Sequence, residues 1–174
     1  MNSQNLISAV EDVLQQGRAL LVTVSGDDYT SRQSASNGAS LGTHYRHVLD
    51  HFFCLIEGIQ TGEVNYDRRG RNPELENSVD AALFATEDLI EEFRALPSEI
   101  WQRECTVLYS IGYGDSEAQA VPSNLARELM FTVGHAIHHF AILKLLCASL
   151  AVSLPYEFGV APSTLKHLEA QAAQ

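Results

Sequence analysis

Four long segments of this 174-residue chain repeat apolar side chains with the 3.6-residue period of an α-helix. Each such helix must bury one face, and four of them can do so by packing against one another. The pattern therefore predicts an all-α protein built as a four-helix bundle. The segments cover residues 3–24, 41–58, 76–96 and 123–150, with Ser40 or Thr43 as candidate N-cap of the second and Pro97 after the third.

Shorter elements are expected between and after these helices. Residues 104–111 alternate in polarity ahead of the turn 112–115, which predicts a short β-strand or β-hairpin before the last long helix. Residues 25–38 and 61–73 are polar and rich in turn-forming residues, so we expect loops there. A short terminal helix begins at Ser163. Without a repeat or a linker, residues 1–174 are expected to form a single domain.

The charge balance argues against a nucleic-acid partner. The chain carries 22 acidic and 11 basic residues, a formal net charge of −11, whereas phosphate-backbone binding needs clustered lysine and arginine. No membrane span is expected, because the longest apolar run, residues 140–152, is interrupted by Lys144 and Ser149. The three cysteines are widely separated and form no Cys-x-x-Cys pair, as is typical of buried thiols in a cytoplasmic protein.

Six of the seven histidines lie in two of the predicted helices, about ninety positions apart. They are His44, His47 and His51 in one helix and His135, His138 and His139 in the other. Four residues advance a helix by about 400°, so His135 and His139 lie one turn apart on one face, whereas His138 is rotated about 100° from His139. This is the spacing of a metal-binding pair.

One further imidazole from a facing helix would complete a three-histidine site with an open coordination position, as catalytic metal sites have. From spacing alone, His44, His47 or His51 could supply it. Imidazole suits several divalent ions; we expect Zn or Ni first, with Fe or Mn as alternatives.

Other polar residues near these histidines have open roles. Asp50 could orient an imidazole or face solvent, and Asp50 or Glu128 could serve as a catalytic helper. Arg46, Arg69 or Arg71 could bind the carboxylate of a cosubstrate, or the arginines at 68–71 could simply balance nearby acids. Cys54, two helical turns after His47, is expected to pack in the core.

Several segments together resemble the DinB/YfiT-like family of metal-dependent enzymes, over most of the chain. They are Gly42-Thr-His-Tyr-Arg-His-Val-Leu-Asp-His-Phe, Asn65-Tyr-Asp-Arg-Arg-Gly-Arg, the helix sequence from Asn124 to Ala141 with Gly-His-Ala-Ile-His-His-Phe, and Phe158-Gly-Val-Ala-Pro-Ser-Thr. The resemblance implies a four-helix bundle with one long crossover connection. It also implies metal ligands at His47, within the His-Leu-x-Asp-like segment 47–50, and at His135 and His139, with His44 and His51 as additions to the family pattern.

The resemblance implies an activity as well. Family members with assigned reactions are transferases and isomerases that use a low-molecular-weight thiol, namely glutathione, mycothiol or bacillithiol, activated by the metal. A small-molecule substrate, a thiol cosubstrate and a homodimer are therefore expected here. Two alternatives stay open from the sequence: a non-catalytic bundle, with or without a structural metal, and a metal-dependent hydrolase.

Overall fold

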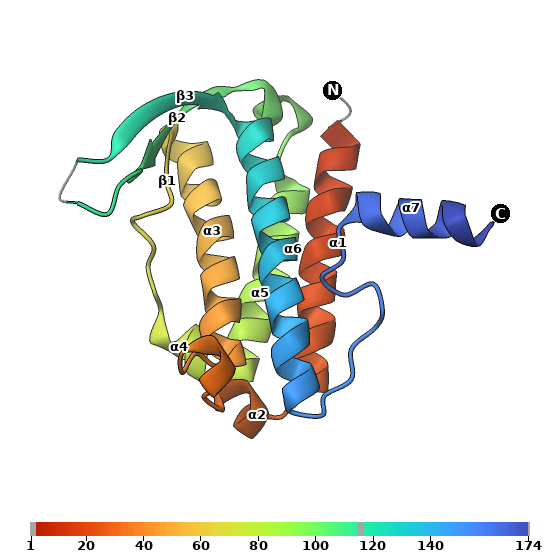
Figure 1. The fold of residues 1–174 in the computed structure, drawn as a ribbon. Helices are drawn as coiled ribbons and strands as arrows, with labels where there is room; N and C mark the ends of the chain where they lie inside the picture. The colour runs from red at the N-terminus through yellow and green to blue at the C-terminus, as the bar shows by residue number, and fades with distance from the viewer. Residues whose placement is uncertain (1–2, 115–116, 174) are drawn as a thin grey trace.

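The computed structural model describes residues 3–114 and 117–173. Four long helices run side by side (Figure 1). They are α1 (Ser3–Thr23), α3 (Leu41–Thr61), α5 (Val79–Ala95) and α6 (Leu125–Ser149). Helix α1 packs against α5 and α6, and α3 packs against the same two helices. The predicted all-α four-helix bundle is therefore confirmed, with helix bounds within a few residues of those expected.

The connection between α3 and α5 is long because these two helices run in the same direction. After α3 the chain forms strand β1 (Glu63–Asn65) at one end of the bundle and returns along its length to helix α4 (Pro73–Asn77) at the other end (Figure 1). Asn72 caps α4 by accepting a hydrogen bond from the Glu74 backbone N–H. Residues 62–78 are thus the long crossover that the family resemblance implied.

Two glycines of α3 allow the crossover to approach the helix closely. A Cβ atom on Gly42 would collide with the backbone carbonyl of Glu76 in α4, and one on Gly58 would collide with Val64 in β1. Gly62, which ends α3, has a φ of 80°, a conformation that glycine adopts without steric cost. These contacts hold both ends of the crossover against α3.

Strand β1 belongs to a three-stranded sheet that covers its end of the bundle. Strand β2 (Glu104–Tyr109) pairs with β3 (Gln119–Asn124) in an antiparallel hairpin, as predicted, and β1 pairs with β2 in parallel. Residue 115, the last of the predicted turn, lies outside the described residues. Asn124 ends β3 and caps α6, accepting a hydrogen bond from the Arg127 N–H. The sheet therefore feeds directly into the last long helix.

Short elements occupy segments that we expected to be loops. Helix α2 (Gly26–Thr30) and the 3₁₀ helix η1 (Ser34–Ser36) interrupt residues 25–38, and β1 and α4 lie in the crossover. Ser25 starts α2 by accepting a hydrogen bond from the Asp28 N–H. Another 3₁₀ helix, η2 (Ser98–Gln102), precedes β2. Such elements of three to five residues are too short for a periodic sequence pattern to reveal.

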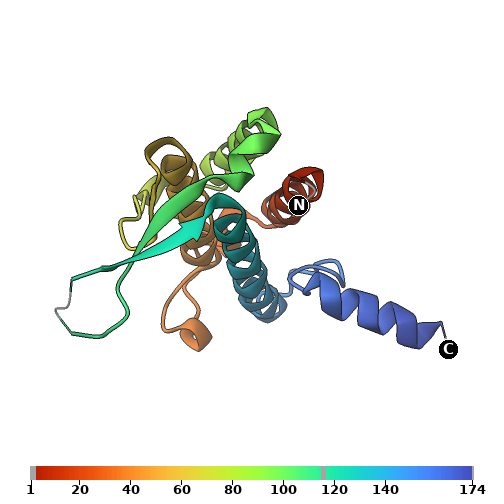
Figure 2. The same cartoon turned by 90° about the horizontal axis from the view of Figure 1, so that it is seen from above.

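Helix α6 is long and apolar. By length and composition it could cross a membrane, but a core helix of a bundle has the same properties, and α6 packs against both α1 and α3. Burial of α6 residues such as Leu129, Phe140 and Leu143 in the bundle therefore accounts for part of its apolar sequence. The terminal helix α7 (Pro162–Ala172) has no buried residues and projects away from the bundle (Figure 2).

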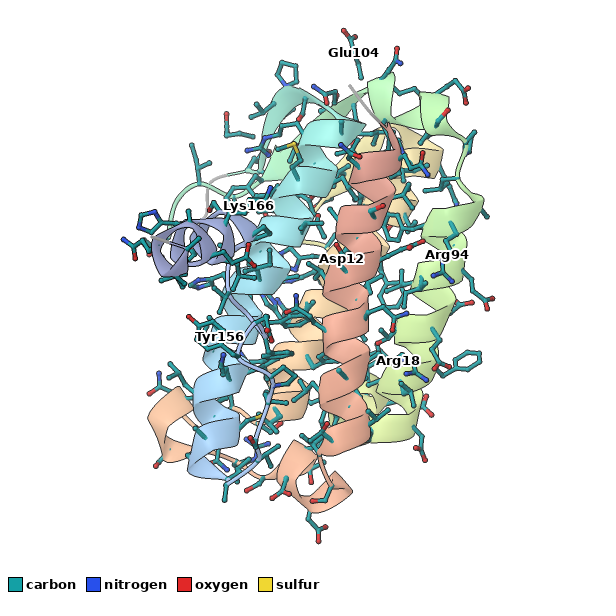
Figure 3. The ribbon with its side chains drawn as sticks, turned by 90° about the vertical axis from the view of Figure 1, so that its right-hand side faces the viewer. Asp12, Arg18, Arg94, Glu104, Tyr156 and Lys166 are labelled. Atoms are coloured by element: carbon teal, nitrogen blue, oxygen red, sulfur yellow. The ribbon has the colours of Figure 1, made fainter. Side chains whose placement is uncertain are left out.

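Ion pairs tie α1 to α5 on the outer surface. Arg18 pairs with Glu87 at 2.9 Å and Arg94 with Glu11 at 2.7 Å, and Figure 3 shows the two arginines on neighbouring helices. Exposed pairs of this kind contribute little stability. The core beneath supplies most of it, and its largest buried side chains include Trp101, Tyr45, Phe52, Phe93, Phe140 and Phe158.

Candidate metal centre

Helices α3 and α6 bring together histidines that lie far apart in the chain. One ring nitrogen of each of His47, His135 and His139 lies within 4.8 Å of the corresponding nitrogens of the other two. The Nε2 atoms of His47 and His135 are 3.0 Å apart. These are the three residues that the family resemblance implies as ligands, and the capped start of α3 and the sheet-anchored start of α6 set their positions.

The two remaining histidines of α3 lie one turn on either side of His47. His44 Nδ1 is 3.3 Å from His139 Nδ1, and the buried His44 Nε2 has no hydrogen-bond partner among the described residues. His51 stacks on His135 with ring centroids 4.0 Å apart and donates its Nδ1–H to the His47 carbonyl at 2.9 Å. His44 and His51 therefore each contact a histidine of the cluster, and His138 is exposed.

The environment keeps the three histidines neutral. Burial, reinforced by neighbouring imidazoles and Arg69, lowers the pKa of His47 to about 2, of His135 to about 3 and of His139 to about 4. A metal ligand must offer a lone pair, which only the neutral imidazole has. Three converging neutral imidazoles are a donor set that fits a divalent ion.

Arg69 reaches the centre from the crossover. Its Nη1 lies 3.0 Å from Nδ1 of His47, and its buried Nε has no partner among the described residues. Arg71, also a candidate for cosubstrate binding, is exposed and has a left-handed φ of 48°. Of the predicted arginines, Arg69 is the one that the structure brings into contact with a histidine of the cluster.

Arg46 and Asp50 form a buried network beside the site. Arg46 pairs with Asp50 at 2.7 Å and with Glu76 at 3.0 Å, which joins α3 to α4. In the part of the chain that the structure describes, the Asp50 carboxylate makes no hydrogen bond to a histidine. The prediction that Asp50 orients an imidazole therefore finds no contact here.

Glu128 lies in a second polar network, which the sequence did not reveal. Its fully buried carboxylate accepts hydrogen bonds from Tyr66 and Ser123 and pairs with Arg127. The Tyr66 ring packs on His51, with centroids 5.3 Å apart, and so links this network to the histidine cluster. The one sequence feature that could have pointed to this network is that Tyr66 belongs to the segment Asn65-Tyr-Asp-Arg-Arg-Gly-Arg, which carries part of the family resemblance.

The cysteines do not take part in the cluster. All three are buried and free of disulfides, and burial raises the pKa of Cys54 and Cys147 to about 11. Cys54 lies in the hydrophobic core, as expected. A neutral buried thiol is a poor nucleophile and a poor metal ligand, so the candidate site consists of histidines.

Comparison with known proteins adds two findings, and no family model matches the chain. Over 111 residues, 62% of this chain, the sequence is 36% identical to FK506-binding protein 5 of Rhizopus delemar. The match spans 28% of the length of that relative. The whole relative therefore says little about what this chain does.

The fold is similar to a solved structure. The DinB-like protein YjoA from Bacillus subtilis superposes with a TM-score of 0.64, covering 88% of this chain and 98% of that one at 17% sequence identity. Such a bundle, with three histidines gathered between α3 and α6, is compatible with a metal-binding enzyme. At this sequence identity the likeness establishes the fold, and the chain has the DinB-like fold that its sequence resemblance predicted.

Proposed function

We propose that this chain is a metal-dependent enzyme whose divalent ion is held by His47, His135 and His139. The observation that carries the proposal is the convergence of three neutral imidazole nitrogens within 4.8 Å. Zn and Ni suit this donor set best, with Fe or Mn as alternatives. An ion held by three protein ligands keeps an open position and, when bound, lowers the pKa of a water or thiol placed there.

The reaction we propose is transfer of a low-molecular-weight thiol to an electrophile. In this reaction the thiolate sulfur forms a bond to the electrophilic carbon, the leaving group departs with its electron pair, and the thiol proton passes to solvent. The cysteines of the chain are buried with raised pKa values, so the reacting thiol has to come from a cosubstrate.

A cavity that adjoins the histidine cluster through the rings of Tyr66 and Phe131 supports a small-molecule substrate. It has a volume of about 400 Å³, within the usual range of ligand pockets, and lies between the β2–β3 hairpin and α6. Phe131 lines this cavity, and its ring also stacks against His135 with centroids 5.8 Å apart. An apolar or aromatic electrophile in this cavity would contact Phe131, the ring that stacks against His135.

Metal-dependent hydrolysis ranks below thiol transfer because it needs a free carboxylate as general base. Asp50 is paired with Arg46, and Glu128 is surrounded by the hydroxyls of Tyr66 and Ser123. Neither carboxylate is free to accept a proton from a water at the histidines. A non-catalytic bundle remains the other alternative, and it differs in having no exchangeable position on the metal.

The test begins with metal content and continues with a reaction screen. Protein purified without a metal-affinity column is expected to carry about one divalent ion per chain, or to take up one from Zn²⁺ or Ni²⁺. The loaded protein is then assayed for loss of free thiol with glutathione, bacillithiol or mycothiol and a set of activated halides and epoxides. Metal binding without turnover would favour the structural alternative, and failure to bind either ion would refute the metal proposal.

Two further proposals concern the setting of the enzyme. We place it in the cytoplasm, which the free thiols support, since a reducing compartment keeps cysteines unpaired. A homodimer is the oligomeric state that the family resemblance suggests, and size-exclusion chromatography with light scattering tests it.

A further inference from the structure

The hydrogen bond between Arg69 and His47 determines where the proton of His47 lies. A guanidinium has only N–H groups and no acceptor, so Arg69 Nη1 donates and His47 Nδ1 accepts across their 3.0 Å contact. In a neutral imidazole one nitrogen accepts and the other carries the proton. The proton of His47 is therefore on Nε2, and Nε2 donates it to the Nε2 of His135, 3.0 Å away.

This polarity conflicts with metal binding by His47. The nitrogen that faces the cluster carries a proton, whereas a metal ligand must present a lone pair. The proton would have to move to Nδ1, which Arg69 occupies. In established metal sites the outer nitrogen of a ligand histidine donates to a carboxylate, a carbonyl or water, so a donor such as Arg69 is the opposite of the usual partner.

Arg69 also lacks a counter-charge. Among residues 3–114 and 117–173, no carboxylate lies within ion-pair distance of its guanidinium, although the nearby Arg46 has two such partners. Its buried Nε has no hydrogen-bond partner either. A half-buried cation that lacks an anion is unfavourable, so this guanidinium is equipped to receive one.

The segment around Arg69 is anchored at both ends and exposed between them. It is held at its start by the Asp67 carboxylate, which accepts a hydrogen bond from the Ser110 N–H, and at its end by the Asn72 cap of α4. Between these two points, Arg68, Gly70 and Arg71 are exposed. Among the described residues the Arg69 side chain makes one hydrogen bond, to His47, so a displacement of this side chain would break that hydrogen bond alone.

From these contacts we infer that Arg69 alternates between two partners, an inference that rests on the proposed metal site. Without a cation it holds His47 in the tautomer that cannot bind metal. When a cation enters, Arg69 leaves Nδ1 and its donors bind a small anion, a carboxylate or thiolate, at the open side of the three histidines. Metal and anion then strengthen each other's binding, because such coupling is reciprocal.

The first test measures Zn²⁺ affinity by competition with a chelator for wild type, Arg69→Met and Arg68→Met. Arg68 is exposed, lies next in sequence and carries the same charge, so its variant controls for the loss of one positive charge. We expect Arg69→Met to bind Zn²⁺ about tenfold more tightly than wild type, since a hydrogen bond from a charged donor no longer has to break. Arg68→Met should match wild type, and an Arg69→Met protein that binds no more tightly than Arg68→Met would overturn the inference.

The second test titrates azide, as a probe anion, into the Co²⁺-loaded proteins and follows the visible absorption. Wild type and Arg68→Met are expected to bind azide about tenfold more tightly than Arg69→Met. Equal azide affinities would remove the anion-binding role. A misfolded Arg69→Met protein would bind both metal and anion poorly, whereas the inference requires opposite changes.

These outcomes separate the inference from the proposed function. If no protein takes up Zn²⁺ or Co²⁺, the metal site itself is wrong and Arg69 has no such role. If all three proteins bind metal and azide equally, the metal site stands and only the role of Arg69 is refuted.

Discussion

The Nε2 atoms of His47 and His135 lie 3.0 Å apart, although 88 positions separate the two residues in the chain. Because α3 and α6 run in opposite directions, the earlier histidine of α3 meets the later one of α6 (Figure 1). Thus His44 contacts His139, while His51 stacks on His135. His135 and His139 of α6 therefore each have a partner on α3, and His47 lies between the two pairs.

This arrangement predicts two classes of histidine variant. Alanine at His47, His135 or His139 removes one of the three proposed ligands, and we expect each variant to lose the bound ion. Alanine at His44 or His51 should leave about one ion per chain but weaken its binding by about 10- to 100-fold, the usual effect of removing a residue that supports a ligand. Elemental analysis and chelator competition measure both effects.

The exposed His138 provides the control for these variants, since it lies beside His139 on the same helix. His138→Ala should bind metal as wild type does. Full metal content in His47→Ala together with loss in His44→Ala would show that the α3 ligand had been assigned to the wrong residue.

The metal-free protein is expected to lose stability as the pH falls. The pKa values of His47, His135 and His139 are lowered by burial from the usual value of 6.5 to about 2, about 3 and about 4. Below about pH 6.5 the unfolded chain therefore binds protons that the folded chain does not, which favours unfolding. Above that pH both states are neutral, and these histidines add no pH dependence.

Urea denaturation of the metal-free protein at several pH values tests this sign. The urea concentration at the unfolding midpoint should decrease as the pH is lowered from 7.5 to 5. His135→Ala should make this decrease smaller, because it removes one group that must stay neutral in the fold. His167→Ala, in the exposed helix α7, should leave the decrease unchanged. A midpoint that rises on acidification would contradict the lowered pKa values.

Two helical glycines give a matched pair for testing the crossover contacts. Gly42→Ala places a methyl group against the Glu76 carbonyl and should destabilise the protein by about 1–3 kcal/mol. Gly134 lies within α6 with no atom near its missing Cβ, so Gly134→Ala should stabilise by up to about 1 kcal/mol. Thermal or urea denaturation compares them, and equal effects would mean that α4 does not pack on α3 as described.

The sequence predicted the long elements well because periodicity reports which side of a helix is buried. The histidine spacing placed His135 and His139 on one face, but it could not choose among three candidates on α3. That choice depends on the relative shift of α3 and α6, which is set by the packing of the two helices against each other and not by a local sequence pattern. The contact between Arg69 and His47 depends on the path of the crossover, which has no repeating pattern from which to predict it.

The buried network around Glu128 was also hidden from sequence, and it can be tested by a double-mutant cycle. The carboxylate of Glu128 has zero exposure and accepts a hydrogen bond from the Tyr66 hydroxyl at 3.1 Å. Glu128→Gln keeps the shape of the side chain but turns one hydrogen-bond acceptor into a donor. We expect this variant to lose about 1.5–3 kcal/mol of its free energy of unfolding. Tyr66→Phe should cost about 1 kcal/mol.

These two side chains contact each other, so their effects should not be additive. The double variant Glu128→Gln/Tyr66→Phe should lose less free energy of unfolding than the sum of the two single losses, by about 0.5 kcal/mol or more. Glu104→Gln, an exposed glutamate in β2, controls for the charge change and should lie near wild type. Urea denaturation of the metal-free proteins gives the free energies of unfolding of the four proteins in the cycle, wild type included, and of the control. Additive losses would mean that the hydroxyl and the carboxylate do not interact, and the link from Glu128 through Tyr66 to His51 would then lose its first contact.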